Sequence, residues 1–248
     1  MIRLLVGLLA ISQTTIQPTV VSPDEWSHYD ARRASAPIAI DGAVTEKEWA
    51  KAGKITQWSD LVQPEWPLMN PTTARMLWDD DYFYLAFECA DDDIWGTMTK
   101  PDDFIFIEEV AEIYIDPEGK GRHYWEIEIS PRNTVLDIMV PMAGWEVLAP
   151  TTCKYDVIGL RSAVKVYGTL DDRTDKDEKW TVEMAIPWSE FKGRKVNVPP
   201  RDGDSWRIQL FRIERPGPYP AEEQVVSWSK SPGVYHEPRN FGVVTFWR

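Results

Sequence analysis

The sequence predicts an all-β fold, an antiparallel β-sandwich of the jelly-roll type with one or two short helices. Three observations support this prediction. Apolar and polar residues alternate in many short segments, as in strands with one buried face. Clusters of Asp, Gly and Pro separate most of these segments, as turns between strands require. Only one segment has a helical pattern, and a sandwich of 248 residues can form a single unit.

The N-terminal region predicts export. Arg3 precedes an apolar run over 4–11, which is typical of a secretory signal peptide and too short to span a bilayer. An ordinary buried segment is the alternative interpretation. We therefore expect a signal peptide over 1–18, a linker or edge segment over 19–36, and a single β-sandwich domain over 37–248. Secretion, extracellular or periplasmic, and no transmembrane segment follow from this interpretation.

Periodicity places the elements in order. Thr45 and Glu48 match a capping box, which predicts a short helix over 46–52 that buries Trp49. Alternation with a period of two then predicts strands at 82–89, 111–116, 124–129, 134–140, 160–167, 180–186, 205–211 and 241–247. The acidic stretch 171–179 lies between two of these strands, so we expect a solvated hairpin loop there.

Charge and cysteine content exclude several functions. The chain has 27 basic and 40 acidic residues, a formal charge of -13, which disfavours nucleic acids and anionic membranes because both are bound mainly by Lys and Arg. Neutral sugars and cations such as calcium remain compatible. Cys89 and Cys153 are the two cysteines, so the chain holds at most one disulfide and no four-cysteine zinc site. Whether they pair stays open.

Tryptophan is unusually frequent, with 13 residues in 248. A sandwich core needs only a few such large side chains, so some are expected at a surface. An aromatic ring can stack on the C–H face of a pyranose while polar groups at the rim bind its hydroxyls. Strand positions predict a core role for Trp125, Trp180 and Trp206. Positions in loops or after turns indicate surface candidates at Trp66, Trp95 and Trp145.

The chain resembles the family 9 carbohydrate-binding modules in the order of its motifs, which are IDGAVTEKEW, LWDDDYFYLAFECADDDIW, EIYIDPEG, YWEIEISPRN, WTVEMAIPW and RNFGVVTF. The resemblance extends from Pro37 to Arg248. It implies a non-catalytic β-sandwich that binds plant or microbial polysaccharides, or their chain ends, in carbohydrate catabolism. It also implies an association with glycoside hydrolases, and structural calcium in some members.

The resemblance also implies a ligand site. Phe106 and Tyr235 stand where the family has two tryptophans that hold a sugar between them. Glu112 and Gln209 match polar ligand contacts, whereas Glu126 replaces a family arginine. Glu112 and Gln209 alternate with apolar residues, so each should project from the sheet face opposite the core. Two aromatic faces and a few hydrogen bonds, offset by the cost of association, predict dissociation constants on the order of micromolar to millimolar.

Asp172, Asp175 and Asp177 in the hairpin loop are candidate calcium ligands, because their carboxylates are hard oxygen ligands, and no cofactor is required. Solvated loop acids are the alternative interpretation, because the spacing is not that of an EF-hand. His236 adjoins Tyr235 and is either a ligand contact or a surface histidine.

Two further functions stay open from the residues. Glu112, Glu126, Glu128 and Glu183 are strand carboxylates that could supply the pair a glycoside hydrolase needs. The second is b-type haem binding for electron transfer, by analogy with similar sandwiches in the haem-binding subunits of some periplasmic dehydrogenases. Methionines such as Met139 and Met142 would then be haem ligands, although methionine in a β-core usually fills space.

Overall fold

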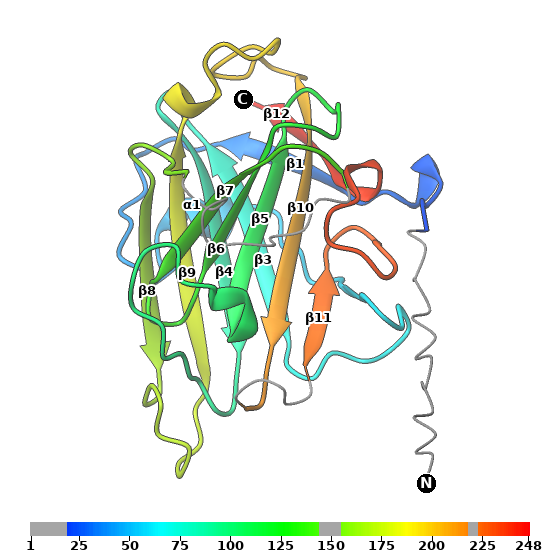
Figure 1. The fold of residues 1–248 in the computed structure, drawn as a ribbon. Helices are drawn as coiled ribbons and strands as arrows, with labels where there is room; N and C mark the ends of the chain where they lie inside the picture. Colours follow the sequence, from blue (N-terminus) through cyan, green and yellow to red (C-terminus); the bar gives the residue numbers. More distant parts are fainter. Residues whose placement is uncertain (1–18, 144–154, 218–222) are drawn as a thin grey trace, which may run out of the picture.

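The computed structural model describes residues 19–143, 155–217 and 223–248. In these ranges, 12 strands join through hydrogen bonds into one sheet, which bends into the two layers seen in Figure 1. The strands are β1 His28–Arg33, β2 Ser59–Asp60, β3 Thr72–Trp78, β4 Tyr82–Ala90, β5 Val110–Asp116, β6 Tyr124–Ile129, β7 Val135–Val140, β8 Arg161–Tyr167, β9 Lys179–Pro187, β10 Ser205–Glu214, β11 Gln224–Ser227 and β12 Gly242–Trp247. The predicted all-β sandwich is confirmed.

In the described residues, helices are short and few. They are α1 Lys47–Lys51 and the 3-10 turns η1 Pro23–Glu25, η2 Ile105–Ile107, η4 Trp188–Phe191 and η5 Pro238–Asn240. No helix in the described part of the chain is long and apolar enough to cross a membrane.

The predicted helix exists, but its predicted cap does not form. Trp49 of α1 is buried and donates a 2.7 Å hydrogen bond from Nε1 to Glu183. The N-cap is Glu46. Glu48 instead accepts hydrogen bonds from the backbone N–H and hydroxyl of Ser35, at 2.8 and 2.9 Å. A tertiary contact has replaced the local capping box.

The strand order is β7-β6-β5-β10-β12-β1-β3-β4-β9-β8, and β11 and β2 extend the sheet beside β10. All eight predicted strands are present. β1, β2, β3 and β11 were not predicted. The sequence of β3, TTARMLW, begins with two polar residues and ends with three consecutive apolar ones, so it has no clear alternation, whereas β2 and β11 are very short.

Strand β1 corrects the prediction of a linker or edge segment over 19–36. It lies inside the sheet and pairs in parallel with β12 on one side and β3 on the other, so the sandwich is mixed rather than purely antiparallel. Its sequence HYDARR is largely polar, and its β12 partner lies at the other end of the chain. No local pattern therefore indicated it.

Alternate residues of the two layers meet in one apolar core, which contains Trp125, Trp180 and Trp206 as predicted. Cys89 is also buried there, and burial raises the pKa of its thiol to about 12. Cys153 and the expected signal peptide lie outside the described residues, so the pairing of the cysteines stays open and export stays a prediction.

A second apolar cluster lies on the outer face of β5, β6 and β10. It contains Tyr114, Tyr124, Phe211 and Ile213 from the strands and Ile105 and Phe241 from segments that cover them. These segments are η2 and the cover segment, which we define as residues 228–241 between β11 and β12. The outer face of this layer is therefore partly enclosed, and the enclosure creates the site described next.

Candidate functional site

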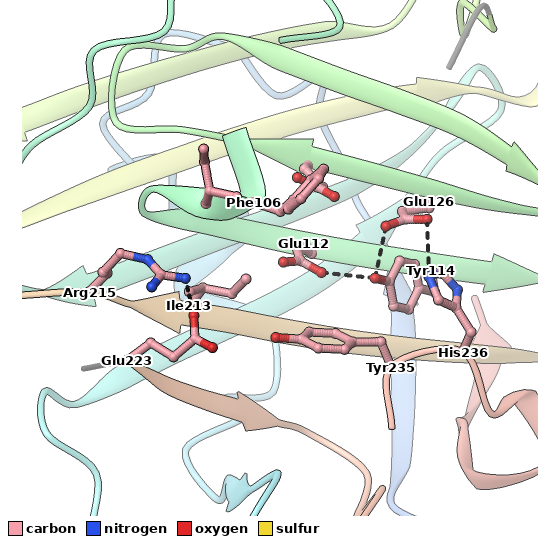
Figure 2. Close-up of a pocket in the computed structure, with 11 residues that line it drawn as sticks. Phe106, Glu112, Tyr114, Glu126, Ile213, Arg215, Glu223, Tyr235 and His236 are labelled. Carbon is pink, nitrogen blue, oxygen red and sulfur yellow. Dashed lines mark hydrogen bonds and ion pairs between the residues drawn. The ribbon is translucent and has the colours of Figure 1, made fainter. Parts of the chain in front are cut away.

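A pocket of about 460 Å³ opens on this outer face, and Figure 2 shows the side chains around it. Its volume suits a small-molecule ligand. We call it the aromatic pocket. Its lining residues are Phe106, Ile107, Glu112, Tyr114, Glu126, Glu128, Ile213, Arg215, Glu223, Tyr235 and His236.

Two aromatic side chains form walls of the pocket. Phe106 comes from η2 and Tyr235 from the cover segment, and Figure 2 shows them on opposite sides of Glu112. Each ring is supported from behind. Phe104 contacts Phe106, and Phe211 contacts Tyr235, both with ring centroids 5.2 Å apart. Both walls are thus held in place before any ligand binds.

The base of the pocket carries three glutamates, Glu112 of β5 and Glu126 and Glu128 of β6, which we call the glutamate trio. All three are buried, and they offer carboxylate oxygens within 4.8 Å of one another. They come together because Glu112 is directly opposite Glu128 in the β5–β6 register and Glu126 points from the same face of β6.

Tyr114 connects two members of this trio. Its hydroxyl lies 2.9 Å from Glu126 Oε1 and 3.1 Å from Glu112 Oε2. Burial, and then the nearby Glu126 carboxylate, raise the pKa of Glu112 to about 8. Glu112 Oε1 accepts no hydrogen bond from any described residue. One buried carboxyl oxygen is therefore available to a ligand.

The remaining polar groups lie beside this base. His236 Nδ1 is 2.9 Å from the Tyr124 hydroxyl, and its Nε2 is 3.9 Å from Glu126 Oε2. Arg215 forms an ion pair with Glu223. The pocket thus combines aromatic faces with hydrogen-bonding groups.

The structure brings together four of the residues predicted for the ligand site: Phe106, Glu112, Glu126 and Tyr235. Gln209 requires a correction, because it does not line the pocket. Its Oε1 accepts hydrogen bonds from Ser229 N at 2.9 Å and Leu210 N at 3.1 Å, and its Nε2 donates to Ser229 O at 2.7 Å. Gln209 projects from the predicted face, but it anchors the cover segment.

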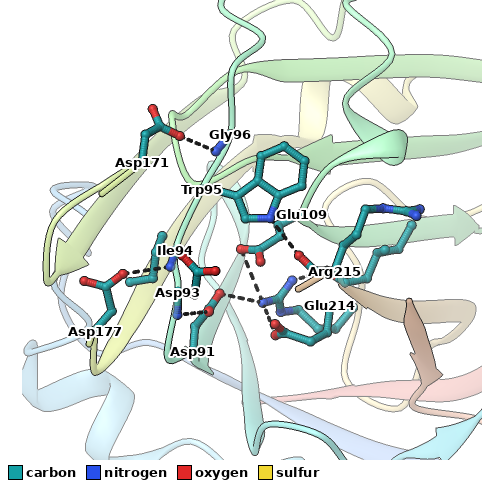
Figure 3. Close-up of polar contacts among 12 residues, drawn as sticks. Asp91, Asp93, Ile94, Trp95, Gly96, Glu109, Asp171, Asp177, Glu214 and Arg215 are labelled. Carbon is teal, nitrogen blue, oxygen red and sulfur yellow. Dashed lines mark hydrogen bonds and ion pairs between the residues drawn. The ribbon is translucent and has the colours of Figure 1, made fainter. Parts of the chain in front are cut away.

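The tryptophans predicted as surface candidates lie outside the aromatic pocket or outside the described residues. Trp95 is only 5% exposed, so it is a buried residue rather than a surface platform. Its Nε1 donates a 2.7 Å hydrogen bond to Arg215 O (Figure 3), and it borders a neighbouring hollow with Arg173 and Asp171. Trp66 is 53% exposed and does not line the aromatic pocket. Trp145 lies outside the described residues.

The hairpin acids do not gather as a calcium site. Asp177 accepts 2.7 Å hydrogen bonds from Thr169 N and Ile94 N, the second visible in Figure 3. Asp172 accepts hydrogen bonds from the backbone and hydroxyl of Thr174. Among the described residues, the acidic groups with clustered oxygens do not include Asp172, Asp175 and Asp177. Asp172 and Asp177 shape the loop, and calcium binding stays a prediction.

The methionines considered for haem are also separate from the pocket. Met139 packs against the main core, and Met142 is 61% exposed. Neither lines the aromatic pocket.

The sequence interpretation did not identify Tyr114, Ile213, Arg215 and Glu223 as lining residues. Tyr114 and Ile213 could have been found, because each lies two residues along a strand from another residue of the outer face. Arg215 and Glu223 flank the connection between β10 and β11, where periodicity gives no signal.

Solved structures share this architecture. A Bacteroides uniformis protein to which carbohydrate binding has been ascribed matches with a TM-score of 0.63 and 18% identity, over 89% of this chain and 99% of that one. A family 9 carbohydrate-binding module of Caldicellulosiruptor kristjanssonii in complex with cellotriose matches this chain with a TM-score of 0.61 and 13% identity, over 89% of this chain and 94% of that one. A family 9 module of the same organism in complex with glucose matches with a TM-score of 0.58 and 14% identity, over 88% of this chain and 96% of that one. At these identities the similarity concerns the fold.

The fold is therefore that of carbohydrate-binding β-sandwiches. The family model described as carbohydrate family 9 binding domain-like matches residues 40–136, and the predicted resemblance to family 9 is confirmed. No curated protein sequence matches this chain significantly. The family match supports carbohydrate binding and a non-catalytic role.

Proposed function

We propose that this chain binds a carbohydrate in the aromatic pocket and does not cleave it. One pyranose ring lies between Phe106 and Tyr235, and Glu112, Glu126 and His236 hydrogen-bond to its polar groups. The observation that carries this proposal is the position of the two supported aromatic rings on either side of a buried carboxyl group.

The chemistry of a sugar fits this arrangement. The C–H groups on a pyranose face carry partial positive charge and favour the negative face of an aromatic ring, whereas the hydroxyls need hydrogen-bond partners. Because the rings are already held in place, little conformational entropy is lost on binding. The unpaired Glu112 Oε1 offers a further contact.

The ligand class, the location and the partners belong to this proposal. Family 9 structures in complex with cellotriose and glucose support a role in recognising oligosaccharides or polysaccharides. We further propose that the chain is secreted and acts in polysaccharide catabolism beside a glycoside hydrolase.

Calorimetry with a panel of monosaccharides and oligosaccharides tests the proposal. Replacing Phe106 and Tyr235 together by alanine removes both stacking faces, so affinity should fall at least about tenfold. Trp66→Ala is the control, since this exposed aromatic residue lies outside the pocket and should leave affinity unchanged. Unchanged affinity in a folded Phe106→Ala/Tyr235→Ala variant would reject the pocket as the site.

Glycoside hydrolysis is a second candidate, because a buried carboxyl group with a raised pKa lies beside a second carboxylate in a ligand-sized pocket. Such a pair can act as general acid and base or nucleophile. Release of reducing ends from xylan or cello-oligosaccharides, lost in Glu112→Gln, would favour this function. An inactive preparation that still binds sugar would favour the binding role.

A further inference from the structure

The aromatic pocket contains more carboxyl groups than a neutral sugar requires. Among the described lining residues, four are glutamates, Glu112, Glu126, Glu128 and Glu223, whereas the basic ones are Arg215 and His236. Arg215 is paired with Glu223 beside the glutamate trio. Glu112 Oε1 accepts no hydrogen bond from any described residue, so one buried carboxyl oxygen in the pocket has no donor before a ligand binds.

The trio is buried and crowded. Its members are at most 4% exposed, and their carboxylate oxygens lie within 4.8 Å of one another. Charges at such distances repel strongly when water is excluded, and Glu112 avoids this repulsion by holding a proton, because burial and Glu126 raise its pKa to about 8. An ammonium group can take the place of that proton. Tyr114 supplies one hydroxyl hydrogen between Glu112 and Glu126, which leaves Glu112 Oε1 without a donor among the described residues.

We propose that the aromatic pocket selects an amino sugar with a free ammonium group, a hexosamine such as glucosamine, alone or within an oligosaccharide. The ammonium group binds among Glu112, Glu126 and Glu128, while the sugar ring lies between Phe106 and Tyr235. This inference rests on the proposed function and specifies its ligand class.

An ammonium group fits this site better than a hydroxyl group does. It brings three hydrogen-bond donors and a positive charge, so it can contact several carboxylates and offset their repulsion. A hydroxyl group donates a single hydrogen bond and leaves the charge unchanged. An N-acetyl group has no charge and adds bulk. The pocket should therefore favour the free amine over both.

The aromatic walls favour the same ligand. The faces of phenylalanine and tyrosine rings attract cations, most strongly where water is excluded. Phe106 and Tyr235 lie on opposite sides of Glu112, so an ammonium group at the trio lies close to both walls.

Calorimetric titration of the full chain with glucosamine, glucose and N-acetylglucosamine at pH 6.5 tests the inference. Glucosamine should bind at least about tenfold more tightly than the other two sugars. Glu112→Gln/Glu126→Gln should remove this preference and retain weak glucose binding, because the aromatic walls are intact. Glu178→Gln removes one exposed carboxylate outside the pocket and should behave as wild type.

The outcomes separate the inference from the proposed function. Glucose binding as tight as that of glucosamine would overturn the inference and keep the carbohydrate pocket. Binding of neutral sugar that requires added calcium and is lost with a chelator would also overturn it, because the trio would then hold a metal ion. Absence of binding to all three sugars and to a wider glycan panel would contradict the proposed function itself.

Discussion

The hydroxyl of Tyr114 lies within hydrogen-bonding distance of Glu112 Oε2, at 3.1 Å, and of Glu126 Oε1, at 2.9 Å. A hydroxyl has one hydrogen and can donate it fully to only one of these carboxyls. The second contact becomes favourable if Glu112 is protonated and donates to the tyrosine oxygen. The raised pKa of Glu112 is consistent with this arrangement. Tyr114 therefore links the protonation of Glu112 to the charge on Glu126.

Tyr114→Phe should destabilise the protein by about 1–3 kcal/mol, because two buried carboxyl groups lose a hydrogen-bonding partner. Sugar affinity should fall as the carboxyls change position. Urea denaturation measures the first effect and calorimetry the second. A variant with unchanged stability would show that the hydroxyl contact contributes little.

Glu112 should make stability depend on pH. Its folded-state pKa of about 8 lies above the ordinary value of 4.5. Between these values the folded protein holds more protons than the unfolded chain, so the free energy of unfolding falls as pH rises. Glu112→Gln removes this contribution. Its stability relative to wild type should therefore increase from pH 5 to pH 8, by on the order of 1 kcal/mol per pH unit at most.

Denaturation of both proteins at several pH values checks this prediction. Comparison with wild type is needed because burial also raises the pKa of Asp137 to about 6 and of Glu214 to about 7. A constant difference between the two proteins over this pH range would contradict the prediction.

Gln209→Ala should release the cover segment. The Gln209 amide makes three hydrogen bonds, and two of them join it to the backbone of Ser229 in this segment, while the third goes to Leu210. We expect a loss of about 1–3 kcal/mol in stability and weaker sugar binding, since Tyr235 is carried by the same segment. Hydrogen exchange should increase in residues 228–241. Faster exchange elsewhere but not there would argue against this anchoring role.

Arg212→Leu should destabilise the protein more than Tyr114→Phe or Gln209→Ala does. Arg212 is fully buried and its Nη2 lies 3.1 Å from Asp91, 2.6 Å from Glu214 and 3.8 Å from Glu109. Removing it leaves three buried acids without their cation, which should cost about 3–5 kcal/mol. Thermal unfolding measures the loss. Combining Arg212→Leu with Asp91→Asn and Glu214→Gln should recover part of the stability.

Much of the fold could be predicted from local periodicity. Strands such as β4 and β9 have long alternating patterns, and Trp125 and Trp180 occupy their expected inward positions. The pattern fails where apolar residues run consecutively, as at the end of β3, or where a largely polar strand is paired with distant segments, as in β1. In both cases tertiary contacts rather than alternation determine the strand.

The site was predictable only in part. The resemblance to family 9 led to Phe106, Glu112, Glu126 and Tyr235, which the fold gathers around one pocket. It could not indicate that the Gln209 amide would hydrogen-bond to the backbone of Ser229, because this contact depends on the path of the cover segment. It also gave no sign that Glu112 and Glu126 would share Tyr114, which requires the register between β5 and β6.

The position of β1 has a consequence for how the molecule can be shortened. A version starting at Pro37 would lack the strand between β12 and β3, although the predicted domain would be intact. Its two halves would each expose an unpaired strand with free backbone hydrogen-bonding groups, and such edges readily pair with other molecules. Self-association or insolubility, rather than a smaller monomer, is the expected result of that truncation.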